Sequence, residues 1–135
     1  MELVRLIQFP LIAEDNGGLV VFEESISGIP FSIKRVFNVS SEKGSLRGMH
    51  AHRHCSQILV CSNGSIEVTC DDSMDREIYI LDKPNYGLLV SPGVWAEQKY
   101  LKHNTTMTVI CDRLYESEDY ISNYVDFKFF ASSLT

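Results

Sequence analysis

The sequence has no Cys-x-x-Cys pair, although it contains four cysteines, Cys55, Cys61, Cys70 and Cys111. Zinc ribbons and thioredoxin-like redox motifs depend on that spacing, so neither is expected here. The N-terminus also lacks the basic leader and apolar stretch of a secretion signal, and disulfides are rare in proteins of reducing compartments. We therefore expect a cytoplasmic protein whose cysteines are buried free thiols that pack as small apolar side chains.

Positive charge is scarce as well, because 12 lysines and arginines stand against 18 aspartates and glutamates, a net charge of -6. Nonspecific nucleic-acid binding needs a positive surface field, so that class of function is not expected. No segment approaches the ~20 apolar residues of a transmembrane helix, so no membrane span is expected either. A local basic pocket for one anionic ligand remains compatible with this charge.

The length of 135 residues and the 44% hydrophobic content predict one domain, covering residues 1–135, with a core of its own. Short strand-like runs separated by turn residues recur along the chain, which is typical of a β-sandwich or barrel. They cover residues 19–22, 31–39, 57–61, 65–70, 77–81, 86–90 and 105–111. The dipeptide Asn63-Gly64 between two of these runs predicts a tight hairpin.

The C-terminal segment has a different pattern. Apolar residues between Tyr120 and Phe129 recur at steps of three and four, which indicates a short amphipathic helix. Ser117 is a candidate N-cap because its hydroxyl can accept from the first free backbone N–H groups. We expect this helix to pack on the outside of the barrel.

Three of the four histidines, His50, His52 and His54, follow one another at alternate positions. Residues two apart in a strand point to the same face, so these imidazoles should lie side by side. Imidazole titrates near neutral pH, which suits proton transfer. Two neutral imidazoles can equally hold a metal ion, so the pair alone leaves acid–base catalysis and metal binding open.

The spacing of Gly44, His50, His52, Gln57 and Gly64 matches the first motif of the cupin superfamily. This resemblance implies a jelly roll, the double-stranded β-helix of cupins, as the fold of an all-β chain with a short C-terminal helix. Metal cupins usually carry a glutamate at the Gln57 position and draw a third histidine from a later strand.

That later segment, residues 92–97, contains no histidine, and His103 lies too far along the chain to match. Glu97 or Gln57 could still supply a third ligand, but a neutral amide is a poor ligand for a transition metal. We therefore expect the two histidines to work without a metal.

Further stretches resemble the nucleotide-sugar 3,4-ketoisomerases, which act on dTDP-4-keto-6-deoxyglucose in deoxysugar pathways. The resemblance is carried by residues 29–36 (IPFSIKRV), 47–52 (RGMHAH), 57–65 (QILVCSNGS), 87–95 (GLLVSPGVW) and the tail 115–129. It covers nearly the whole chain, and RGMHAH followed by LVCSNGS is more specific than the general cupin spacing.

The resemblance implies a metal-independent isomerase without a cofactor, which moves a carbonyl from C4 to C3 of a dTDP-linked keto-deoxysugar through an enediol. It also implies a homodimer, with N-terminal strands that two copies can exchange. The product would pass to an aminotransferase and end in lipopolysaccharide O-antigen, an S-layer glycan or a glycosylated antibiotic.

If the roles in this family carry over, His50 and His52 are the catalytic acid–base pair, and His52 is the expected base. Arg35 and Arg47 match arginines of the family, and their fork of donors suits a pyrophosphate or an enolate oxygen. Gln57 is expected on the neighbouring inward strand, within reach of sugar or histidine. Trp95 is expected either to stack on the sugar or base, or to belong to the core.

The chain departs from the family pattern at several positions in the expected binding site. Phe37 and Asn38 stand where tyrosines are usual, Ala96 where a histidine is frequent, and Asn16 where an arginine is frequent. His54 adds an imidazole that the pattern lacks. A phenylalanine cannot transfer a proton, so these changes would alter the product configuration at C4, the nucleotide sugar accepted, or the activity itself.

Two other functions therefore remain open. The chain could be a non-catalytic nucleotide-sugar-binding cupin that partners a pathway enzyme, which the missing tyrosines and histidine favour and the retained histidine pair opposes. It could also be a metal-dependent cupin such as a dioxygenase, which bound metal would reveal. Epimerases of the same pathways share the fold, but the RGMHAH motif is closer to the ketoisomerases.

Overall fold

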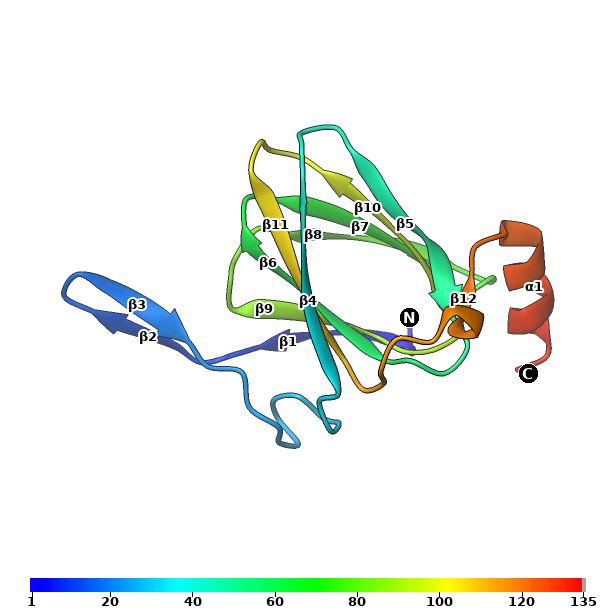
Figure 1. Ribbon diagram of the computed structural model, residues 1–135, viewed down its shortest axis with the longest axis horizontal. Helices are drawn as coiled ribbons and strands as arrows, with labels where there is room; N and C mark the ends of the chain where they lie inside the picture. The colour runs from blue at the N-terminus through cyan, green and yellow to red at the C-terminus, as the bar shows by residue number, and fades with distance from the viewer. Residues whose placement is uncertain (135) are drawn as a thin grey trace.

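Two antiparallel five-stranded sheets face each other in the computed structural model, which describes residues 1–134 (Figure 1). The first sheet has the order β1 (Val4–Gln8), β9 (Tyr86–Val90), β6 (Gln57–Asn63), β11 (Thr105–Cys111) and β4 (Arg35–Ser41). The second has the order β12 (Tyr120–Ile121), β5 (Leu46–His52), β10 (Trp95–Tyr100), β7 (Ile66–Asp71) and β8 (Arg76–Leu81). This architecture confirms the predicted all-β jelly roll.

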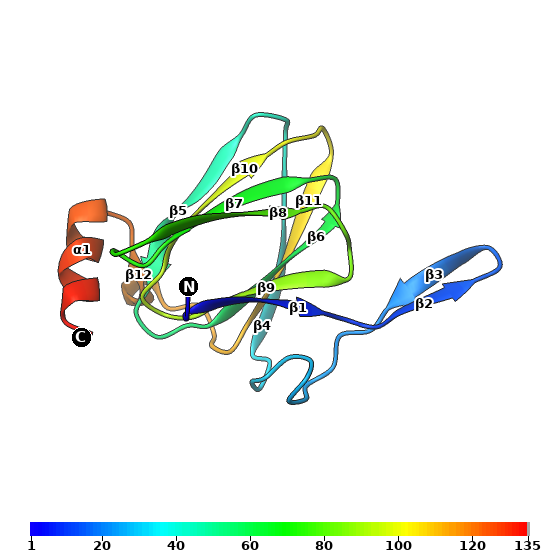
Figure 2. The same cartoon turned by 180° about the vertical axis from the view of Figure 1, so that it is seen from behind.

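A two-stranded arm and the helix lie at opposite ends of the barrel, as the view from behind also shows (Figure 2). The arm consists of β2 (Leu11–Glu14) and β3 (Gly17–Val20), which pair only with each other among the described residues. The helix, α1 (Tyr124–Ser132), covers the outer face of the second sheet through Phe127 and Ala131, which pack on Ala51 and Trp95. The predicted helix outside the barrel is thus confirmed.

The core fills the space between the two sheets. Strands β7 and β11 alternate buried and half-buried residues, as expected for strands with one face inward. Residues 57–61 of β6 are all buried, because their outer face is covered by Ile7, Phe9 and Ile29. The four cysteines are buried free thiols, as predicted.

The prediction of a hairpin at Asn63-Gly64 is wrong. Strand β6 pairs with β9 and β11 in the first sheet, whereas β7 pairs with β10 and β8 in the second. Gly64, with a positive φ of 95°, therefore turns the chain from one sheet to the other and not back along the same sheet. Asn63-Gly64 does form a tight turn. The two strands that it joins, however, lie in different sheets and bury their apolar faces against each other across the sandwich.

The start of the predicted helix is also wrong. Ser117 opens a 3-10 turn, Ser117–Asp119, and Asn123 caps α1 by accepting from the N–H of Asp126 at 3.1 Å. Between them, β12 pairs with β5, so that Tyr120 lies opposite His52. Strand pairing thus overrides the helical periodicity of this segment. No helix among residues 1–134 is long and apolar enough to cross a membrane.

Candidate active site

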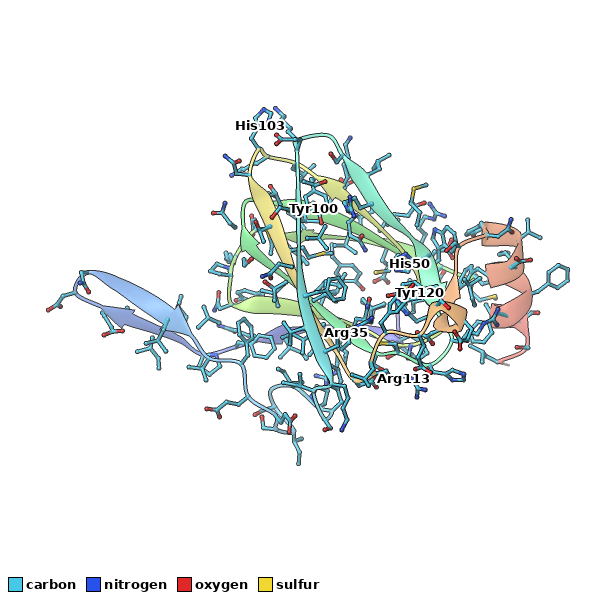
Figure 3. All side chains as sticks on the ribbon, in the orientation of Figure 1. Arg35, His50, Tyr100, His103, Arg113 and Tyr120 are labelled. Atoms are coloured by element: carbon cyan, nitrogen blue, oxygen red, sulfur yellow. The ribbon has the colours of Figure 1, made fainter. Side chains whose placement is uncertain are left out.

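A cavity of about 170 Å³ opens between the two sheets and brings together four of the residues expected from the sequence, Phe37, Arg47, His50 and Gln57. Arg47 is exposed at its rim, whereas Gln57 is buried. The remaining lining residues are Val39, Gly48, Leu59, Gln98, Tyr100, Met107, Val109 and Tyr120. Figure 3 shows His50, Tyr120 and Arg35 on the side of the barrel nearer to α1 than to the arm.

A β-bulge in strand β5 sets the direction of the His50 ring. The register between β5 and β10 shifts between Ala96 and Glu97, and both Gly48 and Met49 have positive φ values, 80° and 58°. The bulge brings the carbonyl of Gly48 to 3.0 Å from Nδ1 of His50. A proton on Nδ1 would be donated to that carbonyl, which leaves Nε2 of His50 as the free nitrogen.

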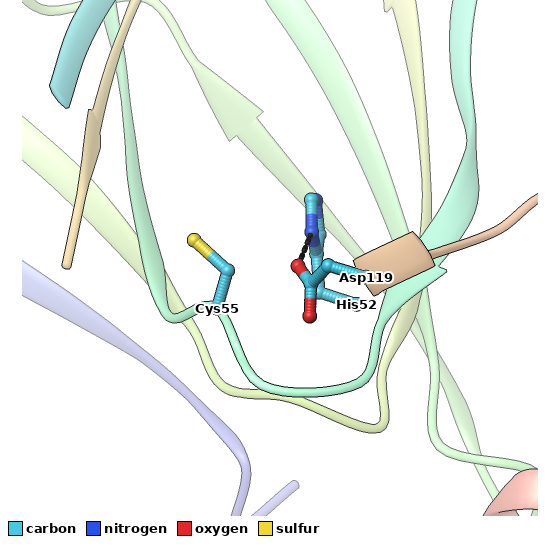
Figure 4. Close-up of side chains that lie close together, drawn as sticks. All are labelled: His52, Cys55 and Asp119. Carbon is cyan, nitrogen blue, oxygen red and sulfur yellow. Dashed lines mark hydrogen bonds and ion pairs between the residues drawn. The ribbon is translucent and has the colours of Figure 1, made fainter. Parts of the chain in front are cut away.

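His52 is held by a carboxylate that the sequence analysis did not identify. Its Nδ1 lies 2.7 Å from Oδ2 of Asp119, and the two side chains are only 8% and 5% exposed (Figure 4). Asp119 accepts from the backbone N–H of His54 at 2.6 Å with its other oxygen, so its orientation is fixed. Because Nδ1–H donates to the carboxylate, the free lone pair of His52 lies on Nε2. That nitrogen is buried and has no hydrogen-bond partner among residues 1–134.

Both imidazoles are poised in the neutral form. Burial lowers the pKa of His50 below its usual 6.5, and the nearby His52 lowers it further. Burial also lowers the pKa of His52, and the hydrogen bond that its Nδ1–H donates to Asp119 offsets only part of that effect. The ring centroids lie 5.0 Å apart in an edge-to-face arrangement. A neutral histidine pair can accept a proton near neutral pH.

Tyr120 and Arg35 complete the polar group around the histidines. The Tyr120 ring lies 4.5 Å from the His52 ring and 5.0 Å from the His50 ring, measured between centroids. Arg35 donates from Nη2 to the Tyr120 hydroxyl at 3.5 Å, and its guanidinium lies over the Phe37 ring at 5.3 Å. Nε of Arg35 is buried without a partner among the described residues. The site therefore presents a free acceptor, Nε2 of His52, and a free donor, Nε of Arg35.

Gln57 reaches a thiol and not a histidine. Its Nε2 donates to Sγ of Cys111 at 3.5 Å, and Nη2 of Arg35 approaches the same sulfur at 3.6 Å. Cys111 lies directly between these residues, since it faces Arg35 on β4 and Gln57 on β6. Donated hydrogen bonds from Cys55 and Arg35 lower the pKa of the Cys111 thiol despite its burial.

Three residues expected at the site lie elsewhere. His54 is exposed, because β5 ends at His52 and the alternation stops there. Asn38 is exposed on the outer face of β4, where it accepts from the Thr108 hydroxyl at 2.7 Å. Trp95 belongs to the core beneath α1 and donates to Glu97 at 3.3 Å, so the core role is the one the structure supports.

The structure also shows where two of the residues that depart from the family pattern, Ala96 and Asn16, lie. Ala96 is buried and pairs with His50 across β5 and β10. Asn16 lies at the turn of the arm, far along the chain from the cavity lining. Glu97, considered as a metal ligand, accepts the Trp95 indole N–H instead.

The sequence analysis did not identify Asp119 and Tyr120 as neighbours of the histidine pair. They sit in a tail whose periodicity indicated a helix, and no motif marks them. The pairing of β12 with β5 alone places them beside His52.

Comparison with known proteins identifies the family to which the chain belongs. The family described as FdtA, WxcM-like, C-terminal, matches residues 2–132. The chain is 42% identical over 125 residues to a TDP-4-oxo-6-deoxy-alpha-D-glucose-3,4-oxoisomerase of Aneurinibacillus thermoaerophilus, covering 92% of this chain and 89% of the relative.

Solved structures agree with this match. QdtA, a sugar 3,4-ketoisomerase of Thermoanaerobacterium thermosaccharolyticum crystallised with TDP, is 33% identical with a TM-score of 0.94, covering 99% of this chain and 98% of QdtA. WlaRB, a TDP-quinovose 3,4-ketoisomerase of Campylobacter jejuni, is 27% identical with a TM-score of 0.89, covering 96% of this chain and 99% of WlaRB. The resemblance drawn from the RGMHAH and LVCSNGS segments is thereby confirmed, and the chain belongs to the FdtA family, WxcM-like C-terminal type.

Proposed function

We propose that this protein is a sugar 3,4-ketoisomerase that converts dTDP-4-keto-6-deoxyglucose to a dTDP-3-keto-6-deoxyhexose. The observation that carries the proposal is the buried, unpartnered Nε2 of His52, whose Nδ1 is held at 2.7 Å by Asp119 beside a second neutral imidazole. The relative from Aneurinibacillus is a TDP-4-oxo-6-deoxyglucose 3,4-oxoisomerase, and QdtA was crystallised with TDP. A histidine-to-asparagine variant of QdtA was crystallised with TDP-4-keto-6-deoxyglucose.

The reaction requires a proton to leave C3 and a proton to arrive at C4. In our proposal, Nε2 of His52 takes the C3 proton, and Asp119 stabilises the imidazolium that forms. The C4 oxygen then takes this proton back from the His52 imidazolium and gives the enediol. Nε2 of His50 accepts the C3 hydroxyl proton, directly or through the Tyr120 hydroxyl, and returns it to C4, which completes the isomerisation.

Arg35 and Tyr120 suit the negative oxygen of the intermediate. The free Nε–H of Arg35 is a donor that carries a permanent charge, and its Nη2 already bonds the Tyr120 hydroxyl at 3.5 Å. In our proposal, the oxyanion accepts hydrogen bonds from Nε–H of Arg35 and from the Tyr120 hydroxyl. Because the protein already holds these donors in place, they lower the barrier to enediolate formation. Arg47 and Gln57 line the cavity, and we assign Arg47 to the pyrophosphate and Gln57 to the sugar.

Proton NMR in deuterated water tests this function. Chelator-treated protein is incubated with dTDP-4-keto-6-deoxyglucose, and we expect deuterium to enter the sugar as a 3-keto product appears. The spectrum also gives the configuration at C4. Absence of both exchange and product would refute the isomerase assignment.

A matched pair of variants tests the role of His52. His52→Asn should abolish turnover with little loss of fold, because it removes the free imidazole nitrogen. His54→Asn makes the same change at an exposed residue outside the cavity and should keep wild-type activity. Near-normal turnover in His52→Asn would contradict the assignment of this base.

A second function, nucleotide-sugar binding without catalysis, is favoured by one observation. Phe37 lines the cavity directly over Arg35, at a position where a tyrosine could have transferred a proton. Binding of dTDP-4-keto-6-deoxyglucose without exchange in the NMR experiment would support this alternative. Restoring Phe37→Tyr would then be the first variant to test.

We also propose that the protein is a homodimer joined through the arm. Leu11, Ile12 and Leu19 on β2 and β3 are 56%, 48% and 44% exposed, an unusual concentration of apolar surface on a hairpin that pairs with no other strand among residues 1–134. A hollow of about 660 Å³ at the base of the arm, lined in part by Phe9 and Val21, offers a seat for the arm of a second copy. Light scattering tests the mass, and Leu19→Asp should shift a dimer toward monomer.

We place the protein in the cytoplasm as a single cupin domain over residues 1–135. Its four cysteines are free thiols, which is the usual state in a reducing compartment. The isomerised sugar would pass to an enzyme that adds an amino group at the new C3 carbonyl.

A further inference from the structure

Three ligand-type side chains with different donor atoms meet beside the histidine pair. Ring nitrogen, thiol sulfur and carboxylate oxygen of His52, Cys55 and Asp119 all lie within 4.8 Å of one another, and all three residues are buried (Figure 4). The proposed isomerisation uses His52 and Asp119, but it gives the Cys55 thiol no task. The proposed catalysis therefore does not explain why the Cys55 thiol lies beside His52 and Asp119.

The fold holds these three groups together by more than proximity. His52 ends β5, and the chain then turns so that the N–H of His54 donates to Oδ1 of Asp119 at 2.6 Å. The nearby backbone N–H of Cys55 also helps to lower the pKa of this carboxylate. Hydrogen bonds to His52 and His54 therefore hold Asp119 against the turn that carries Cys55.

The donor chemistry selects a class of cation. One imidazole, one thiol and one carboxylate form a mixed set that suits Zn²⁺ and related thiophilic ions, whereas Mg²⁺ prefers oxygen ligands alone. Bonds of about 2.0–2.3 Å in a tetrahedral site place ligand atoms roughly 3–4 Å apart, so the most distant donors need to approach by only about 1 Å. Nδ1 of His52 and Oδ2 of Asp119, now 2.7 Å apart, need to separate slightly. The ring nitrogen that faces the cluster is Nδ1, whereas Nε2 is buried without a partner among the described residues and can take the proton that a metal ion on Nδ1 would displace.

This set differs from the ligands that a metal cupin would use. His50 bonds the Gly48 carbonyl and is not part of the cluster, and Gln57 bonds Cys111. The cluster instead draws on the turn after β5 and on the 3-10 turn before β12, two segments brought together only by the fold.

We propose that His52, Cys55 and Asp119 form an inhibitory site for a thiophilic divalent cation, best fitted by Zn²⁺. Binding displaces the thiol proton of Cys55 to solvent, and the metal replaces the proton on Nδ1 of His52. That proton moves to Nε2 and so blocks the nitrogen that would act as the base. The carboxylate of Asp119 then bonds the metal and no longer serves the imidazole. The inhibitory consequence rests on the proposed function, whereas the binding itself does not.

Binding is tested first, without any assay of activity. Chelator-treated protein, kept reduced so that Cys55 and Cys111 stay as thiols, is titrated with Co²⁺ and then, by equilibrium dialysis, with Zn²⁺. We expect one ion per chain, a thiolate-to-cobalt charge-transfer band, and no binding of Mg²⁺. Cys55→Ala should abolish the band and weaken Zn²⁺ binding by about 100-fold or more, since even loss of a supporting group costs 10–100-fold.

Cys61→Ala is the matched control, because Cys61 is another buried cysteine outside the cluster. It should keep both the band and the affinity. Asp119→Asn serves as a second variant if Cys55→Ala fails to fold, and it should weaken binding as well. A cobalt spectrum without a thiolate band, or one unchanged in Cys55→Ala, would overturn the site.

Inhibition is tested second, with the NMR isomerase assay. Zn²⁺ should inhibit the wild-type protein and Cys61→Ala, and a chelator should restore activity, while Cys55→Ala should resist the same Zn²⁺ concentration. Equal inhibition of Cys55→Ala, or tight binding without inhibition, would overturn the claim that the ion engages His52. If the protein shows no isomerase activity at all, the proposed function fails, and the cobalt and dialysis results still decide the metal site.

Discussion

Asp119→Asn is the sharpest test of how the site works. The buried carboxylate accepts from Nδ1 of His52 at 2.7 Å and thereby keeps the lone pair of the ring on Nε2. An asparagine amide can turn its N–H₂ group toward Nδ1, which moves the ring proton to Nε2 and removes the acceptor that takes the C3 proton. The substitution also removes the negative charge that stabilises the imidazolium.

The size of the effect follows from these two losses. A hydrogen bond to a charged group contributes about 1.5–3 kcal/mol, which is one to two powers of ten in rate at about 1.36 kcal/mol per tenfold. The reversed tautomer adds a factor of similar size. We therefore expect kcat to fall about 10³-fold, with a small change in KM because Asp119 does not line the cavity.

The fold should survive this change. Asparagine keeps an oxygen that can accept from the N–H of His54, so the free energy of unfolding should drop by only about 1–2 kcal/mol. The assay is steady-state conversion of dTDP-4-keto-6-deoxyglucose, with circular dichroism as a check on folding. Glu118→Gln, the neighbouring exposed acid, is the control and should retain wild-type kcat. A kcat of Asp119→Asn within about tenfold of wild type would refute the assignment of Asp119 as the group that positions His52.

Three further predictions follow from the same geometry. Burial lowers the pKa of both His50 and His52 below 6.5, so kcat/KM should hold as pH falls to 6.5 and decline only below it; an acid limb at or above 6.5 would contradict neutral, buried imidazoles. The unfolded chain binds more protons than the folded one in that range, so the free energy of unfolding, measured with urea, should also decrease on acidification below 6.5 and not above it. Gly48→Ala places a Cβ against the side-chain amide of Gln98 at a φ of 80°, so it should cost about 1–3 kcal/mol of stability and reduce activity, whereas an unchanged Tm would show that the bulge relaxes freely. Arg47→Ala should raise KM several-fold with kcat nearly kept, because Arg47 lies at the cavity rim, and equal affinity for dTDP by calorimetry would remove it from the nucleotide site.

The histidine pair and its immediate surroundings were predictable from the sequence. The alternation of His50 and His52 in a strand places both rings on the inner face, because side-chain direction in a strand has a period of two residues. Gln57, on the next strand, also lines the cavity as expected. Arg47 lies three residues before His50, so the same rule would point it to the outer face, and it reaches the cavity only because the bulge at Gly48 and Met49 shifts the register. The rule fails at His54, since nothing in the local sequence marks where β5 ends.

Turn residues in the sequence did not predict which strands pair with each other. Asn63-Gly64 has the chemistry of a tight turn, yet the chain uses it to pass from one sheet to the other. Turn residues determine only that the backbone reverses. Whether the next strand pairs alongside or packs across the sandwich depends on which apolar faces meet, and that is a property of the whole core.

Asp119 and Tyr120 show what only the tertiary structure decided. Asp119 stands 67 residues from His52 in the sequence, and the surrounding residues have the periodicity of a helix. The sequence by itself determined the strand content, the jelly roll and the imidazole pair, because these depend on alternation and motif spacing. Asp119, which fixes the tautomer of His52, reaches His52 and Cys55 only because β12 pairs with β5. That pairing joins segments far apart in the sequence, so no local sequence pattern predicts it.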